Sequence, residues 1–75
     1  MITLATWDTE LAAERAREAY RYVARQYPKD APLEPLGRAL RAVLETQERR
    51  DWGGYEEALR ELMRTAKREA LRRAA

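Results

Sequence analysis

The large apolar residues of this chain gather most densely between positions 33 and 44. This stretch contains Leu33, Leu36, Leu40, Val43 and Leu44, which recur at the spacing of one face of an α-helix. Pro35 suits the first helical turn, because its missing N–H would have no intrahelical partner there. The pattern predicts a helix over residues 35–50, with its charged side chains on the opposite face.

Two further amphipathic stretches flank this helix. Residues 8–26 predict a helix whose apolar face, continued to position 27, is mostly alanine: Ala12, Ala16, Ala19, Tyr20, Val23 and Tyr27. Pro28 ends it, because the residue before a proline is pushed out of the α region. Residues 55–72 predict a third helix, with an apolar stripe formed by Tyr55, Leu59, Leu62, Met63, Ala66 and Ala70.

Short connectors join the three predicted helices and make consecutive helices antiparallel neighbours. We expect Gly53 and Gly54 to form the second connector, because glycine accepts left-handed backbone angles. Gly37 lies inside the second helix, where a close helix crossing or an irregular helix start would explain it. The fold class is therefore all-α: residues 1–75 form a single helical domain, a small three-helix bundle.

In an extended conformation the first seven residues would place Ile2 and Leu4 on one side and Thr3 and Ala5 on the other. We interpret them as an extended N-terminal arm that lies across the helices and is anchored by Ile2, Leu4 and Trp7. The alternative is that residues 2–6 pair as a strand with a second chain, because a lone strand needs a partner. This segment resembles the ribbon-helix-helix repressors, in which paired strands read the major groove of DNA.

The composition removes most kinds of catalytic site. The chain has no cysteine, histidine or serine, so disulfides and the common nucleophile–base pairs are excluded, and a zinc or haem site is not expected. Glu45, Glu48 and Asp51 resemble the acidic half of the MazG-type nucleotide pyrophosphohydrolases, which implies Mg²⁺ binding. They face away from the leucine stripe, and we interpret them as a solvated helix face. We expect no enzymatic activity and no cofactor.

Charged residues make up 37% of the chain, yet the net charge is only +2. This balance favours helix surfaces rich in ion pairs over a general binder of polyanions. The lack of asparagine and cysteine is typical of thermophilic proteins, and a GC-rich genome would give the same arginine bias. No apolar run approaches the ~18 residues of a membrane span, so we expect a cytoplasmic protein without membrane contact.

Two surfaces are candidates for binding. Cations gather near the C-terminus and could neutralise phosphates of a nucleic acid, although the helix dipole alone favours cations there: Arg64, Lys67, Arg68, Arg72 and Arg73. The first helix and its surroundings carry more aromatic surface than so short a bundle easily buries. We predict a partner interface formed by Trp7, Ala12, Ala16, Ala19, Tyr20, Tyr22, Val23 and Tyr27.

Residues 54–59 resemble the start of the second helix of a tetratricopeptide repeat, but no second repeat follows. A chain this short buries a small core, and small domains without disulfides or metals often associate with a partner. We therefore expect a non-catalytic protein–protein interaction module that self-associates through the Ala/Tyr face of the first helix. The partner is a second copy or another protein, and a small nucleic-acid-associated protein is the alternative.

Overall fold

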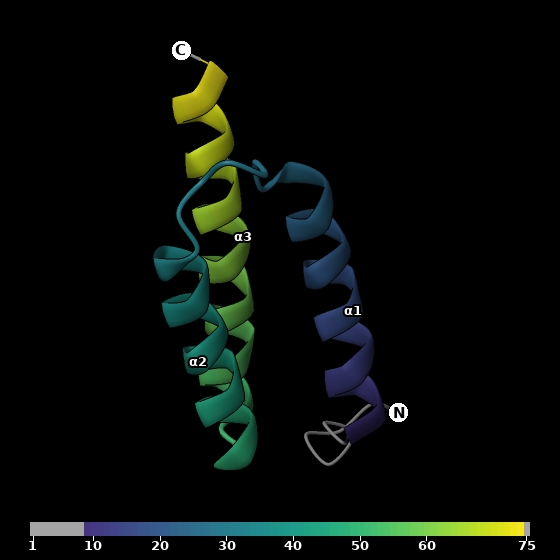
Figure 1. The fold of residues 1–75 in the computed structure, drawn as a ribbon. Coiled ribbons are helices and arrows are strands. Elements are labelled where there is room, and N and C mark those ends of the chain that lie inside the picture. Colours follow the sequence, from purple (N-terminus) through teal and green to yellow (C-terminus); the bar gives the residue numbers. More distant parts are fainter. Residues whose placement is uncertain (1–8, 75) are drawn as a thin grey trace.

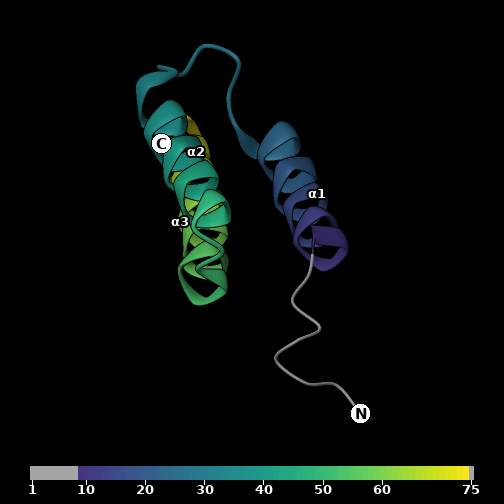
Figure 2. The same cartoon turned by 90° about the horizontal axis from the view of Figure 1, so that it is seen from below.

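The computed structural model describes residues 9–74 and contains three helices, α1 (Thr9–Gln26), α2 (Glu34–Glu48) and α3 (Trp52–Ala74). The all-α prediction is confirmed. The predicted arm with its three anchoring residues lies outside the described residues. The long α3 is the centre of the bundle, because α1 and α2 each pack along it and make only sparse contacts with each other (Figure 1). Viewed along the bundle, α2 and α3 adjoin and α1 stands to one side (Figure 2).

The turn between α2 and α3 differs from the prediction. Arg50 adopts the left-handed conformation, with φ of 57°, and no glycine of the described chain does so. Asp51 then caps α3, because its Oδ1 atom accepts a hydrogen bond from the Gly54 N–H at 3.0 Å. The two glycines therefore lie in the first turn of α3, which begins at Trp52. A Cβ atom on Gly54 would collide with the Asp51 carboxylate, so the glycine leaves room for the cap.

The core is formed where α1 and α2 meet α3. Leu62 and Ala66 of α3 have no exposed surface, and neither does Val43 of α2. Alanines on the two outer helices let them approach α3 closely. The phenol of Tyr55, 1% exposed, crosses from α3 to α1, where its hydroxyl donates a hydrogen bond to the Ala12 carbonyl at 2.8 Å.

The connector between α1 and α2 is held to the end of α3. The Tyr27 hydroxyl donates a hydrogen bond to the Pro32 carbonyl within the connector. Asp30 lies 3.2 Å from the Arg73 guanidinium of α3, and this ion pair joins positions far apart in the sequence. The C-terminal end of α3 projects past the connector (Figure 1). The connector thus fixes the start of α2 relative to α3.

Candidate interaction surface

The predicted interface on α1 is largely turned toward its own chain. Ala12, Ala19 and Val23 are 0%, 1% and 9% exposed, because these small side chains accommodate α3. Three further members are partly buried against the same core: Ala16, Tyr22 and Tyr27. Tyr20 is 40% exposed, and Trp7 lies outside the described residues. The residue set stays a prediction as an interface, but most of its alanine surface is already covered within the chain.

Two of the three exposed leucines of the described chain lie on α2 and its N-cap. Leu33 is 71% exposed and Leu44 is 59% exposed. Between them Leu36 and Leu40 are only partly buried, so the leucines form one continuous row, which we call the leucine face. The sequence pattern identified these residues as one apolar helix face. The most buried part of the contact with α3 is made by the adjacent Ala39 and Val43, and Leu36 and Leu40 pack only partly against it, because the apolar arc is wider than one neighbour can cover.

A groove of about 270 Å³ continues the leucine face toward α1. Its lining is almost wholly apolar and comes from all three helices: Tyr20, Val23, Ala24, Leu36, Leu40 and Leu62. The groove exists because α1 and α2 pack on α3 without packing on each other. Leu62 lies at its base with no exposed surface, and the exposed Tyr20 lies on the α1 side. The groove and the leucine face together form one apolar surface.

Gly37 lies beside the leucine face, and the fold of the described chain does not explain it. A Cβ atom added there would meet nothing within 4 Å, so no close crossing within residues 9–74 requires a glycine. Gly37 itself also lies in regular helix, because α2 already includes Glu34 and the Gly37 N–H bonds to the Leu33 carbonyl at 2.8 Å, although the N-cap Leu33 provides no side-chain cap. Both explanations offered by the sequence are therefore wrong for this part of the chain. A glycine at an exposed helical position costs about 1 kcal/mol relative to alanine.

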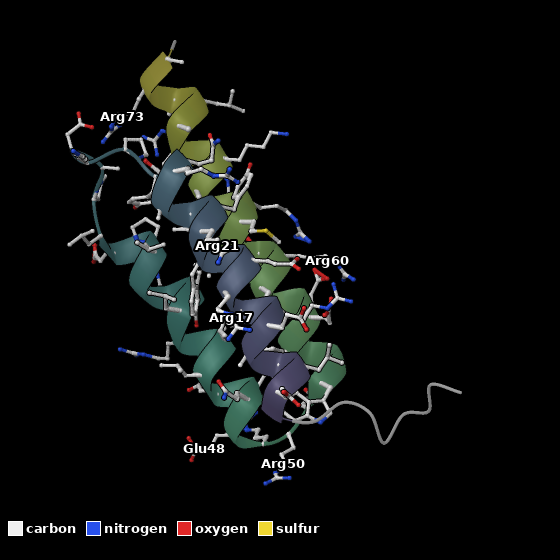
Figure 3. The ribbon with its side chains drawn as sticks, turned by 90° about the vertical axis from the view of Figure 1, so that its right-hand side faces the viewer. Arg17, Arg21, Glu48, Arg50, Arg60 and Arg73 are labelled. Carbon is white, nitrogen blue, oxygen red and sulfur yellow. The ribbon has the colours of Figure 1, made fainter. Side chains whose placement is uncertain are left out.

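Charges of alternating sign border the leucine face on its outer side. Glu34, Arg41 and Glu48 follow one another at seven-residue intervals, which places them along one edge of α2, and all three are exposed. None of them forms an ion pair with another residue between positions 9 and 74. Figure 3 shows Glu48 pointing outward from the lower end of α2. These three exposed side chains form the charged border of the leucine face.

The basic residues predicted for nucleic acid are mostly matched by carboxylates. Arg64 lies 2.8 Å from Glu57 and 2.7 Å from Glu61. The other arginines of the set also have acidic neighbours, at distances of 3.7 Å from Arg68 to Glu61, 3.1 Å from Arg72 to Glu69 and 3.2 Å from Arg73 to Asp30. A phosphate would have to compete with these carboxylates. Lys67 is exposed beside Tyr22 and Met63.

The acidic residues that resemble part of a nucleotide pyrophosphohydrolase lie on α2 and in the turn that follows it. No three potential metal-ligating side chains converge within residues 9–74. Asp51 is already engaged as the cap of α3. Glu45 and Glu48 are exposed on α2, as expected for a solvated helix face.

One carboxylate is buried at the other end of the bundle. Glu69 is 3% exposed, and its Oε2 atom accepts a hydrogen bond from Arg72 at 3.1 Å, while Oε1 has no partner. Burial raises the pKa of the nearby Tyr27 phenol, the Glu69 charge raises it further, and Arg73 opposes the change. These groups join α3 to the connector, so we assign them to the fold and not to a reactive site.

No protein-family model matches this chain, and neither a curated protein nor a solved structure shows significant similarity to it. Among the described residues, no helix combines the length and the apolar character needed to cross a membrane.

Proposed function

We propose that this protein is a non-catalytic interaction module that associates with a second copy of itself. The leucine face of α2 carries the proposal, because Leu33 and Leu44 keep 71% and 59% of their surface exposed in the single chain. Fully burying a leucine side chain contributes about 1.5–3 kcal/mol, so each of these residues has most of that gain still available. The adjoining groove extends the same apolar surface to Tyr20 of α1.

The charges along the border support a second copy as the partner. The edge of α2 presents Glu34, Arg41 and Glu48, which alternate in sign. An identical surface turned end for end can therefore place an acidic residue beside a basic one, as a two-fold interface requires. A partner surface that carries charges of one sign only would repel either the two glutamates or the arginine of this edge. The proposal keeps the self-association expected from the sequence and moves its centre from α1 to α2.

Molecular mass in solution tests the proposal. Light scattering over micromolar to millimolar concentrations should show a monomer that becomes a dimer as concentration rises. The double variant Leu33→Gln/Leu44→Gln should remain a monomer over the same range. Leu71→Gln is the matched control, because Leu71 is 61% exposed near the end of α3, away from the leucine face, and its replacement should leave the dimer unchanged.

Two results would contradict the proposal. One is a chain that stays monomeric up to millimolar concentration. The other is a dimer that survives the double substitution on α2 but dissociates in Leu71→Gln. Circular dichroism of each variant should give the same helix content, because all three substituted side chains are exposed in the single chain.

A further inference from the structure

We propose that the second copy binds with its α2 antiparallel to α2 of the first copy. A two-fold axis relates the two helices and crosses the pair at the level midway between Arg38 and Ala39. In this arrangement Leu40 of each copy sits over Gly37 of the other. The inference rests on the proposed self-association and adds the orientation, the register and a role for the glycine.

The register follows from the spacing of the residues that face outward from α2. Leu33 and Leu44 are equally distant in sequence from the point between Arg38 and Ala39, and so are Gly37 and Leu40. Two antiparallel helices related by a two-fold axis bring such equidistant positions opposite each other. Each exposed leucine at one end of the face then meets the exposed leucine from the opposite end of the other copy. The large Leu40 meets the position that has no side chain.

This contact supplies the explanation that Gly37 lacks within the single chain. The space above its Cα is open, since an added Cβ would meet nothing within 4 Å. A side chain from a facing helix packs into a space between side chains, as a knob enters a hole. Without a Cβ at position 37 that space is deeper, and Leu40 of the second copy can enter it. Two such contacts form, one on each side of the axis.

The border charges select the same orientation. In an antiparallel pair the same edge of each helix faces its equivalent. Glu34 of one copy and Arg41 of the other then differ in level by about 3 Å along the helices, an offset that their long side chains can span, and the two-fold axis repeats the pair. In a parallel pair each facing position would meet its own equivalent. Gly37 would then lie opposite Gly37 and leave an empty space, which forfeits packing contacts. Charge and shape therefore agree on the antiparallel arrangement.

Disulfide trapping tests the orientation, because the chain contains no natural cysteine. Leu33→Cys and Leu44→Cys are prepared separately and equilibrated in a glutathione redox buffer. A covalent dimer should form in the equal mixture of the two variants and not in either variant alone, since only the mixture brings the two thiols opposite each other. Non-reducing electrophoresis and mass spectrometry read the product.

Gly37→Leu tests the role of the glycine. The substitution adds apolar surface and helix propensity, so it should preserve or raise the helix content of the monomer. It should nevertheless raise the dimer dissociation constant by about tenfold or more, because the added side chain occupies the space that Leu40 enters. Ala42→Leu is the matched control. Ala42 is exposed on the opposite side of α2, and its enlargement should leave the dissociation constant unchanged.

The outcomes separate this inference from the proposed function. A dimer in which either single-cysteine variant cross-links to itself would overturn the antiparallel register and leave self-association standing. A dimer that gives no cross-link in the mixture would also overturn the register and leave self-association standing. The same conclusion would follow if Gly37→Leu lowered the dimer dissociation constant or left it unchanged. A wild-type chain that is monomeric at millimolar concentration would remove both.

Discussion

Helices α1 and α2 pack against the same central helix, but they differ in how much of their apolar face this contact buries. α1 meets α3 through small residues, and Ala12 and Ala19 are 0% and 1% exposed in the result. α2 meets α3 through Ala39 and Val43, and its largest apolar side chains remain beside the contact, with Leu44 59% exposed. The contact of α1 therefore uses most of its apolar face, while the contact of α2 uses only part of its own.

The difference shows that an apolar helix face can be buried within its own chain or remain exposed for binding a partner. A row of alanines offers little area, and a close neighbour covers it completely. A row of leucines spread over a wide arc exceeds what one neighbour can cover, and the excess is available for binding. Substitutions at the two contacts should therefore affect different properties, namely the stability of the monomer on the α1 side and association on the α2 side.

The largest loss of monomer stability should come from Leu62→Ala. Leu62 has no exposed surface and lies at the base of the groove between the outer helices. Its truncation leaves a cavity that costs about 2–5 kcal/mol in the free energy of unfolding. Urea denaturation at low protein concentration measures this value. Leu71→Ala, at a position 61% exposed, should change it by only about 0.5 kcal/mol or less.

The close approach of α1 to α3 should be sensitive to added volume. Ala19→Leu should destabilise the monomer by about 1–3 kcal/mol, because Ala19 is 1% exposed in the core and a larger side chain there would overpack it. Ala13 of the same helix is exposed, and Ala13→Leu should be near neutral. The same urea experiment compares the two variants. If both substitutions had equal effects, the contact between α1 and α3 at Ala19 would not be closely packed.

The helices themselves could be predicted from the sequence because each carries an apolar stripe of helical period. The start of α3 could not. The glycine pair indicated a turn, but the left-handed residue is Arg50, whose side chain gives no preference for that conformation, and the cap at Asp51 allows the glycines to be helical. Local residue type was outweighed by the geometry of the cap.

The candidate surface was predicted less well than the fold. Periodicity reveals which face of a helix is apolar, but not how much of that face a neighbour covers. It therefore grouped the exposed Leu33 and Leu44 with the less exposed leucines of the same face, and offered the buried Ala12 and Ala19 as an interface. The signals that could have been weighed are the width of the apolar arc on α2 and the unexplained Gly37 beside it.

A smaller effect on the α1 contact should follow from Tyr55→Phe. The substitution removes the hydrogen bond from the phenol to the Ala12 carbonyl and retains the ring, which packs edge-on against Trp52 at 5.5 Å. The expected cost is about 0.5–1.5 kcal/mol, the typical contribution of one hydrogen bond. Thermal and urea unfolding at neutral pH would measure it. No change in stability would indicate that the bond contributes nothing to this contact.

The same variant has a signature at alkaline pH. Burial raises the pKa of Tyr55 above its ordinary value of 10.0, and the neighbouring Tyr20 and Glu56 raise it further. The stability from the neutral phenol is therefore fully present below a pH of about 10 and is lost as pH rises through the folded pKa. Tyr55→Phe should reduce this alkaline loss without abolishing it, because the pKa of Tyr27 is raised as well.

The smallest effect on the monomer should come from the leucine face. Leu44→Gln should change the free energy of unfolding by only about 0.5 kcal/mol or less when measured at a concentration below the dimer dissociation constant, because the side chain is 59% exposed there. At higher concentration the wild-type chain should gain stability with each increase in concentration, since dimerisation favours the folded state by mass action, and the variant should not. Leu62→Ala should behave in the opposite way. Its free energy of unfolding should be much lower than that of the wild-type chain at low concentration, but it should still rise as the concentration increases. If Leu44→Gln instead destabilised the dilute monomer as strongly as Leu62→Ala, the leucine face would belong to the core, and the contrast between the two helices would disappear.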